Sequence, residues 1–311
     1  MTGNFRFLTV MVMEPAIEVR SLRMAYGDNE VVHGVDLTVH RGEVFAVLGP
    51  NGVGKTTTIE ILEGFRRRTG GVATVLGSDP WNAGGDWRER IGVVLQSSTP
   101  EAELTVSETI DLYGGFYRRP VPAARLLELC GLTEQAGMRN KRLSGGQQRR
   151  LDVALALVGN PELLFLDEPT TGFDPAARRA SWEMIDGLKS LGTTIVLTTH
   201  YLDEAELLAD RIAVIHRGRI VAEGTPATLG GRDRRPTEIV FRLPAGALAP
   251  PPATTSCEDG TWHLLTAEPT QTLYELTKWA LDRGHALVDL DVRRPALEDV
   301  YLDLTKESAL S

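Results

Sequence analysis

The sequence predicts an α/β protein with a parallel sheet covered by helices, an antiparallel β region before it, and a small α+β domain at the C-terminal end. Three observations support this prediction. Residues 16–39 alternate between apolar and polar side chains, as in strands with one face in water. Several later runs are short and continuously apolar, as buried parallel strands are. Segments with helical spacing separate these runs, which favours a parallel sheet with helices on its faces.

The composition is that of a folded globular chain with an acidic surface. Of 311 residues, 42% are hydrophobic and 24% are charged, and the net charge is −9. At about 100–200 residues per domain, this length suits one large and one small domain. The acidic balance disfavours a protein that coats nucleic acid. Cys130 and Cys257 have no CxxC or CxxH spacing, so neither a disulfide framework nor a cysteine metal site is expected.

No segment is expected to cross a membrane. The apolar stretch "FLTVMVM" near the N-terminus is shorter than the roughly 18–20 residues that a span requires. It also lacks the small-residue cleavage site of a signal peptide. We therefore expect a cytoplasmic protein with an N-terminal extension over residues 1–15, in which Met1, Met11 and Met13 are alternative start positions.

The elements of the main domain, residues 16–235, follow in order. "IEVRSL" and "VDLTV" predict antiparallel strands. The runs that predict buried parallel strands are "EVFAVL" (43–48), "ELLFLD" (162–167) and "TTIVLTTH" (193–200). Residues 104–138 have mostly helical spacing, so an α-helical subdomain is expected over about residues 97–160.

Residues 236–311 predict a separate C-terminal accessory domain. "GGRDRRPT" (230–237) combines glycine, charge and proline, and we expect it to be a linker. Strands are predicted at "EIVFRL", "TWHLLTA" and "HALVDLDV", and helices at "TLYELTKWAL" and "ALEDVYLDLT". The proline-rich "LAPPPATTS" (248–256) is expected to be a loop.

A glycine-rich segment after the first buried strand predicts phosphate binding. "GPNGVGKTT" fits G-x-x-x-x-G-K-[ST] between a predicted strand and a predicted helix, which is the context that supports this motif. Glycines let backbone N–H groups converge on phosphate oxygens, and the helix start favours an anion. Lys55 would contact the β and γ phosphates, Thr56 would ligate Mg²⁺, and Thr57 would contact the α phosphate. The predicted nucleotide-binding residues are Gly49, Pro50, Asn51, Gly52, Val53, Gly54, Lys55, Thr56 and Thr57.

The predicted strand at residues 162–167 delivers two carboxylates at its end. Asp167 is expected to reach the magnesium ion directly or through a water molecule. Glu168 points to the other side of the chain and is the candidate general base for an attacking water. A polar turn after a strand is the alternative interpretation, but a phosphate-binding loop in the same sheet favours the catalytic one.

A second glycine-rich segment, "LSGGQQRRLDVALALVG", carries no lysine and has the features of half a site. Ser144 fits a helix N-cap, and an apolar stripe on the following helix anchors it by one face. The stripe consists of Leu151, Ala154, Leu155 and Val158. The start of the helix therefore faces outward with free N–H groups.

Free N–H groups at the start of a helix have a function in binding only when an anion lies close to them. Such a helix start stabilises a nearby anion by roughly 0.3–1 kcal/mol, and by up to ~2 kcal/mol when partly buried. A nucleotide on the P-loop leaves its γ phosphate open on one side, so Ser144, Gly145, Gly146 and Gln147 are expected to complete the site of a second subunit. A capped surface helix would explain Ser144 but not the paired glycines.

The segments "GPNGVGKTT", "LSGGQQRR", "LLFLDEPTTGFDP" and "TTH", in this order and spacing, resemble the nucleotide-binding domain of ATP-binding cassette (ABC) transporters. The resemblance covers about residues 16–230. It implies an α/β P-loop NTPase fold of the ABC ATPase type, with an antiparallel β subdomain and an α-helical subdomain. It also implies ATP and Mg²⁺ as cofactors and ATP hydrolysis as the reaction.

The resemblance assigns roles to four further residues. Tyr26 would stack on the adenine ring. Gln96 would contact Mg²⁺ or the attacking water, and would communicate with the transmembrane partner through the helical subdomain. Asp174 would reach across the dimer, although Phe173 stands where the family more often has leucine. His200 would hydrogen-bond the γ phosphate and orient the candidate base.

The resemblance also implies partners. ATPase subunits of this family pair with a second copy or with a paralogous ATPase, and they act on separate integral membrane permease subunits. The expected location is peripheral, at the inner face of the cell membrane, with membrane contact through the permease only. "VRRPALEDVYLDLT" (292–305) is similar to the C-terminal segment of bacterial drug-exporter-type cassette ATPases of the daunorubicin-resistance kind. This similarity favours export of a drug, antibiotic or lipid-like compound.

Two other classes of function were weighed against transport. Cassette ATPases that act on ribosomes carry two cassettes in one chain, and those that act on DNA insert long coiled coils between Gln96 and Ser144. This chain has neither feature, and its acidic charge disfavours a nucleic-acid partner. A metabolic kinase would use the P-loop but has no need for residues 144–147.

Overall fold

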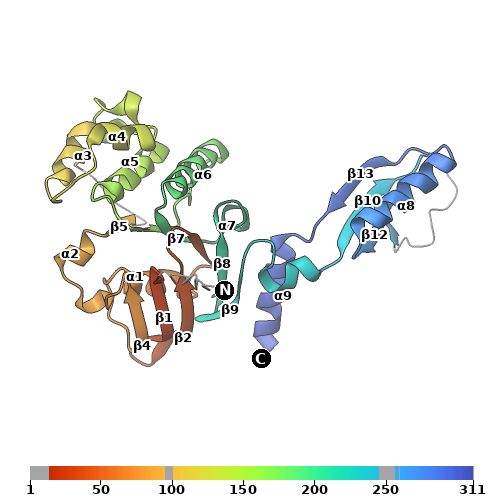
Figure 1. Cartoon of the computed structure of the whole chain (residues 1–311), viewed down its shortest axis with the longest axis horizontal. Coiled ribbons are helices and arrows are strands. Elements are labelled where there is room, and N and C mark those ends of the chain that lie inside the picture. The colour runs from red at the N-terminus through yellow and green to blue at the C-terminus, as the bar shows by residue number, and fades with distance from the viewer. Residues whose placement is uncertain (1–13, 95–100, 245–255, 259, 311) are drawn as a thin grey trace, which may run out of the picture. The chain divides into compact units, whose positions relative to one another are not determined.

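The structure of the chain is a computed structural model that describes residues 14–94, 101–244, 256–258 and 260–310 (Figure 1). The chain forms two compact units, Met1–Val221 and Ala222–Ser311, and each is described by itself. This division falls inside a strand, whereas the sequence places the domain boundary at residue 235. None of the helices in the described residues has both the length and the apolarity needed to cross a membrane.

The first unit contains a three-stranded antiparallel sheet with the order β2-β1-β4. Its strands are β1 (Ile17–Tyr26), β2 (Asn29–Val39) and β4 (Gly70–Val75). Ile17 of β1 lies opposite Val39 on one side and Val75 on the other, and all three side chains are buried. The alternating pattern at the start of the chain therefore predicted the central strand and one edge of this sheet correctly.

The second sheet of this unit has six strands in the order β5-β6-β7-β3-β8-β9. The strands are β3 (Val44–Leu48), β5 (Ile91–Val94), β6 (Leu163–Asp167), β7 (Thr194–Thr199), β8 (Arg211–His216) and β9 (Arg219–Gly224). The pairings from β5 through to β8 are parallel. Every residue of β3, β6 and β7 is buried, which confirms the interpretation of the three apolar runs as buried parallel strands.

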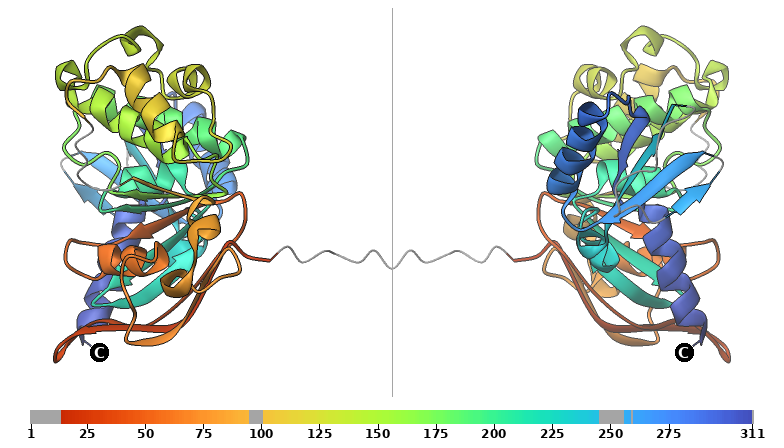
Figure 2. Two further views of the ribbon diagram at one scale, coloured as in Figure 1. Left: turned by 90° about the vertical axis from the view of Figure 1, so that its left-hand side faces the viewer. Right: turned by 90° about the vertical axis from the view of Figure 1, so that its right-hand side faces the viewer.

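Helices cover the parallel sheet and form a separate group beyond it. They are α1 (Lys55–Leu62), α2 (Gly85–Arg88), α3 (Val106–Gly114), α4 (Ala123–Leu129), α5 (Gly145–Leu157), α6 (Pro175–Ser190) and α7 (Leu202–Leu208), with short 3₁₀ turns at Pro80–Asn82, Thr133–Gln135 and Asn140–Arg142. α3, α4 and α5 pack on one another. Figure 2 shows this yellow and green group at the opposite end of the first unit from the red antiparallel sheet.

A shared hydrophobic core fixes α1 between the two sheets. Ile59 and Leu62 of α1 belong to the same buried cluster as Ile17 of the antiparallel sheet and Phe45 and Phe165 of the parallel sheet. Burying a side chain of this size contributes roughly 1.5–3 kcal/mol. The core therefore holds the C-terminal half of α1 between the two sheets.

The second unit is a small α+β domain. Its antiparallel sheet has the order β11-β12-β10-β13. The strands are β10 (Thr237–Arg242), β11 (Ser256–Glu258), β12 (Thr261–Thr266) and β13 (Val288–Arg293), and the helices are α8 (Pro269–Asp282) and α9 (Leu297–Leu310). Ile239, Phe241, Leu264 and Leu276 form its core. Most of the expected loop at 248–256 lies outside the described residues.

One expectation for this unit is corrected. The segment 230–237, expected to be a linker, lies mostly in the 3₁₀ helix η4 (Leu229–Arg234). Leu229 is buried, and a Cβ atom at Gly230, which has φ +56°, would lie 2.6 Å from a methyl group of Val300 in α9. The glycine is therefore explained by close packing on a helix that lies far away in the sequence.

Candidate nucleotide-binding site

The glycine-rich loop after β3 leaves no room for side chains at two of its positions. A Cβ atom at Gly49 would lie 2.4 Å from the Ile215 carbonyl oxygen, and one at Gly54 would lie 2.8 Å from the Val31 carbonyl oxygen. Gly54 also has φ +103°, which L-residues rarely adopt. It is the N-cap of α1, so the loop leads directly into the start of that helix.

Lys55, the first residue of α1, is folded into the loop. Its side-chain nitrogen donates to the carbonyl oxygens of Gly49 at 2.6 Å and Pro50 at 3.1 Å, and lies 3.4 Å from Oε1 of Glu168. Burial lowers the pKa of Lys55, and the nearby Glu168 and Asp167 carboxylates oppose this shift. The loop, the lysine and the carboxylates after β6 therefore form one cluster.

Asp167 ends β6 and is held from three directions. The Thr56 hydroxyl donates to its Oδ2 at 3.4 Å, and the Thr198 hydroxyl donates to its Oδ1. The Arg149 guanidinium donates to its backbone carbonyl at 2.8 Å. Thr56 and Asp167, the two predicted magnesium ligands that the structure describes, therefore lie side by side.

Glu168 is held in a strained backbone conformation. Its φ is +46°, and its N–H donates to the Thr198 hydroxyl at 3.0 Å. The side chain is 8% exposed, and its carboxylate accepts a hydrogen bond from Thr171 at 3.1 Å. Burial raises the pKa of Glu168, but the Lys55 ammonium, the Thr171 hydroxyl and His200 together outweigh it, so the pKa lies below its ordinary value. The carboxylate is ionised at neutral pH and can accept a proton.

His200 follows β7 and faces the same carboxylate. Its Nδ1 lies 3.4 Å from Oε1 of Glu168. The imidazole ring packs on Tyr201 with centroids 4.1 Å apart, and the Arg178 guanidinium covers the Tyr201 ring at 4.3 Å. This stack fixes the position of the histidine beside the candidate base.

The space beside these groups fits a nucleotide phosphate chain with a hard cation. A cavity of about 340 Å³ lies against the loop. It is lined by Val31, Asn51, Gly52, Gly54, Lys55, Thr56, Thr57 and Glu168. In the described parts of the chain, no three His, Cys, Asp or Glu side chains could hold a metal by themselves. A hydroxyl and a carboxylate suit Mg²⁺ when phosphate oxygens and water supply its other ligands.

The start of α5 has the geometry that the sequence predicts. The Ser144 hydroxyl accepts a hydrogen bond from the Gln147 N–H at 3.3 Å, and the Gln147 side chain accepts one from the Ser144 N–H at 2.9 Å. Ser144 and Gly145 are exposed, whereas the four residues of the predicted apolar stripe are buried. No residue from 144 to 147 lines the cavity at the P-loop.

Asp174 is the N-cap of α6. Its Oδ1 accepts hydrogen bonds from the N–H groups of Ala176 and Ala177, each at 2.9 Å. Cap residues of this kind typically stabilise a helix by about 1 kcal/mol. The structure thus gives Asp174 a local role, and its predicted contact across a dimer stays a prediction.

Tyr26 ends β1 with 44% of its surface exposed. The Arg66 guanidinium lies over its ring, 5.1 Å from the centroid, and Glu60 holds Arg66 through a 2.6 Å hydrogen bond. One face of the ring is therefore supported by a cation. The predicted adenine stacking is untested, and Gln96 lies outside the described residues.

Sequence reasoning missed or misread several residues that support this site. Arg149 was given no role in the site from its sequence position, but it is 8% exposed and holds Asp167 through the backbone carbonyl. Thr198 was not singled out within its strand, although it bonds both Asp167 and Glu168. Thr198 is the register partner of Asp167 across β6 and β7, so only the strand pairing reveals it.

The fold and the site are those of a P-loop ATPase in which two helices, α1 and α5, begin at glycine-rich segments. Comparison with known proteins then gives the family. Residues 32–171 match the family described as ABC transporter, and residues 237–296 match an ABC transporter domain-containing protein-like C-terminal domain. The chain belongs to the ABC transporter family, as an ATP-binding subunit that hydrolyses ATP.

Two relatives and one solved structure illustrate the similarity. The daunorubicin resistance ATP-binding protein DrrA2 of Streptomyces coeruleorubidus is 36% identical over 310 residues, which cover 93% of this chain and 95% of that one. The Nod factor export ATP-binding protein I of Cupriavidus pinatubonensis is 43% identical over 229 residues, 71% of this chain and 70% of that one. An ATP-binding cassette of an ABC transporter in its ADP conformation has a TM-score of 0.61 at 27% identity, over 68% of this chain and 91% of that one.

Proposed function

We propose that this chain energises export through separate integral membrane permease subunits, and works at the inner face of the cell membrane. Relatives named for daunorubicin resistance and Nod factor export support this proposal. They do not favour the alternative of an ATPase that acts on the ribosome or on DNA. The exported compound is proposed to be a drug, antibiotic or lipid-like molecule.

Each nucleotide site is proposed to form between two ATPase protomers, either two copies of this chain or one copy and a paralogue. The observation that carries this proposal is the separation of two half-sites. The cavity at the P-loop is lined by loop residues together with Val31 and Glu168, whereas the helix start at residues 144–147, whose first two residues are exposed, lines no part of it. A helix start attracts anions. Two protomers facing each other would give each P-loop the Ser144 segment of the other.

Within each site, we assign the proton transfer to Glu168. The lowered pKa keeps its carboxylate ionised, and contacts to Lys55 and Thr171 fix its position. It would accept a proton from water as the water attacks the γ phosphate, while His200 and Lys55 stabilise the charge that develops on the phosphate oxygens. Asp174 would meet the facing protomer.

The cofactors are proposed to be ATP and Mg²⁺. Thr56 and Asp167 would hold the metal, with Gln96 as the further predicted ligand. Mg²⁺ supplies charge neutralisation on the phosphates. Tyr26 would bind the adenine ring on the face not covered by Arg66, and Gly49–Thr57 would bind the phosphates.

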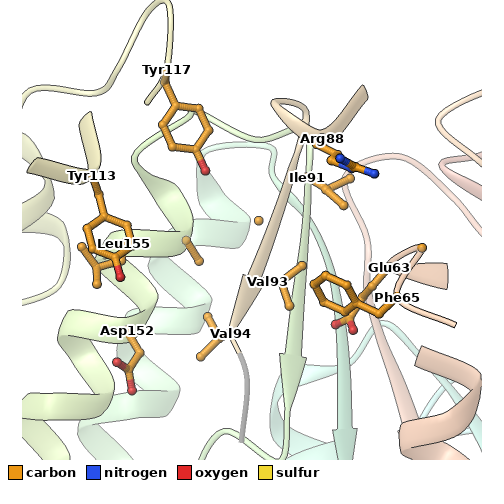
Figure 3. Close-up of a pocket in the computed structure, with 13 residues that line it drawn as sticks. Glu63, Phe65, Arg88, Ile91, Val93, Val94, Tyr113, Tyr117, Asp152 and Leu155 are labelled. Atoms are coloured by element: carbon orange, nitrogen blue, oxygen red, sulfur yellow. The ribbon is translucent and has the colours of Figure 1, made fainter. Parts of the chain in front are cut away.

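The permease is proposed to dock in a pocket between the parallel sheet and the helical group (Figure 3). The pocket has a volume of about 400 Å³, and its walls come from the end of α1, from β5 and from α3 and α5. Phe65 is 63% exposed and Tyr113 is 37% exposed. Apolar surface of this kind is typical of a contact with another protein.

Membrane isolation tests this function. A tagged chain recovered from detergent-solubilised membranes of the cells that naturally produce it should carry a multi-spanning membrane protein in fixed ratio. The ATPase activity of that complex should change when candidate export substrates are added. Recovery of the chain only as an uncomplexed ATPase would contradict the proposal.

A further inference from the structure

Glu63 is a buried acid outside the nucleotide site. It is the residue after α1, and only 6% of its surface is exposed. Within the described residues, no hydrogen bond or ion pair to its carboxyl group is found. Burial raises the pKa of Glu63 to about 8, and it is the largest cause of the shift. The charged neighbours Asp167 and Glu60 are also acidic and raise the pKa further in the same direction. A buried acid without a cation is costly, so this position needs an explanation.

Glu63 lines the pocket proposed for permease docking, and a second acid lines it too. Figure 3 shows Glu63 on one side of the β5 side chains Val93 and Val94, and Asp152 of α5 on the other. Asp152 is 8% exposed. The pocket thus combines an apolar floor with acidic groups on opposite walls.

A single basic residue, Arg88, is among the 13 residues that line the pocket, and it is exposed. Aromatic rings form much of the remaining wall: Phe65, Tyr113 and Tyr117. Gly159 makes room for one of them, because a Cβ atom there would lie 2.4 Å from the Tyr117 ring. Aromatic rings and carboxyl groups together suit the stem and head of a long cationic side chain.

We propose that this pocket receives a lysine or arginine side chain from a cytoplasmic segment of the permease, with the cationic head at Glu63 and the stem against the aromatic side chains. This inference rests on the proposed function and deepens it by naming the chemistry of the partner. A cation bound in the pocket would then pair with Glu63, beside which the described residues place none.

Other occupants fit less well. An acidic segment would add negative charge to a pocket that already holds Glu63 and Asp152, and would make ionisation of the buried Glu63 still more costly. A purely apolar segment would cover Glu63 and leave a polar group buried without a partner. A cation offsets the burial of the carboxyl group, and arginine also packs on aromatic faces.

Cross-linking in native membranes identifies the occupant. A photoreactive amino acid replaces Tyr113 on the pocket wall of the full-length chain, in the cells that naturally produce it. After illumination, the cross-linked peptide is sequenced by mass spectrometry. The expected product is a cytoplasmic segment of an integral membrane protein with a lysine or arginine at or beside the attachment point.

Charge variants then test the role of Glu63. Glu63→Gln should weaken association with the solubilised permease at least about 10-fold, as is usual when one partner of a buried charge pair is lost. Its basal ATPase activity should stay unchanged. Glu63→Lys should abolish association, and replacing the permease cation with glutamate should restore it. Glu128→Gln, an exposed glutamate of α4, is the control.

The outcomes separate the inference from the proposed function. A permease segment that cross-links but carries no basic residue, or an unchanged affinity of Glu63→Gln, overturns the inference and leaves permease coupling intact. Failure of a complementary charge to restore binding to Glu63→Lys also overturns it. If no membrane protein cross-links at Tyr113, both the inference and the proposed docking fail.

Discussion

The two ends of α1 differ in the surroundings of their buried ionisable side chains. At its start, Lys55 lies 3.4 Å from Glu168, and both side chains are buried. At its end, Glu63 is equally buried, and within the described part of the chain the charges that act on it are acidic. The pKa of Glu168 is lowered and that of Glu63 is raised to about 8. At the start of α1 the buried charges are paired within the chain, whereas at its end the buried acid is suited to pair with a cation from a partner.

This difference shows how one helix can serve two processes. Contacts of Lys55 with the P-loop hold the start of α1, and the shared core holds its C-terminal half. The nucleotide site and the proposed docking pocket therefore share one helix. Where chemistry takes place, the charges are paired in advance, because preorganised groups stabilise the transition state best. At the proposed docking pocket, the chain places no cation beside Glu63 within its described residues. A partner segment without a basic residue would leave Glu63 buried and unpaired, and this provides specificity.

The largest effect is expected at the start of α1. Glu168→Gln removes the proposed base while keeping its shape, so turnover should fall by about 10²–10⁴-fold. ATP should still bind, and the variant should accumulate as a dimer. Steady-state ATPase assays and analytical ultracentrifugation measure the two effects. Glu183→Gln, an exposed glutamate of α6, should behave like the unchanged chain. Normal hydrolysis by Glu168→Gln would show that Glu168 is not the base.

The next largest effect is expected at the other end, in the dependence of stability on pH. The folded pKa of Glu63 lies above its ordinary value of 4.5, so the folded state holds this proton more tightly. Stability is therefore greatest below pH 4.5 and falls as the pH rises through about 8. Glu63→Gln removes this loss, and should exceed the unchanged chain by a few kcal/mol at pH 8.

Thermal unfolding of both chains between pH 5 and about 9 measures the difference. The gap between them should widen up to about pH 8 and then level off. Glu183→Gln, at an exposed position of α6, is the control for loss of a glutamate. A gap that does not change with pH would mean that folding does not raise the pKa of Glu63, which would contradict its burial without a cation.

A smaller effect is expected for Arg149, which binds the backbone of Asp167. Arg149→Met removes its hydrogen bond to the Asp167 carbonyl, so the free energy of unfolding should fall by about 1.5–3 kcal/mol. The neighbouring Arg150→Met is the matched control, because the hydrogen bond of Arg150 to the Gly131 carbonyl is long, at 3.4 Å. Denaturant titration distinguishes them. Equal stability of the two variants would contradict the assigned role.

The smallest effect concerns Arg66 and the Tyr26 ring. An exposed cation–π contact is worth about 0.5–1 kcal/mol. Arg66→Met should therefore raise the KM for ATP by roughly 2–5-fold and leave kcat unchanged. Arg67→Met is the control. If Tyr26→Ala raises KM while Arg66→Met does not, the arginine has no part in positioning the ring.

The parts of the site that depend on local sequence could be predicted, and those that depend on strand pairing could not. The Ser144 N-cap and the glycines of the P-loop follow from residues within a few positions of one another. Thr198 lies beside Asp167 only because β7 pairs with β6 in that register. Arg149 likewise meets Asp167 only through packing of α5 near the sheet.

The same distinction holds for the fold. Continuous apolar runs predicted β3, β6 and β7, whose burial is complete. The segment at residues 230–237 was misread because its composition suggests a linker. Its conformation depends on packing against α9, which lies far away in the sequence. Glu63 carried no sequence signal, since an acid at a helix end is usually solvated.

The central claim is that each nucleotide site draws on two protomers. Where both protomers are copies of this chain, mixing two inactive variants tests the claim most directly. Lys55→Ala disables the P-loop, and a Ser144→Arg, Gly146→Asp double substitution disables the helix start. In a 1:1 mixture, about half of the dimers are mixed, and each of these has one intact site. Half of the dimers with one of two sites intact give about a quarter of the ATPase activity of the unchanged chain, and the account predicts this value, well above either variant alone. A mixture no more active than its components would contradict it.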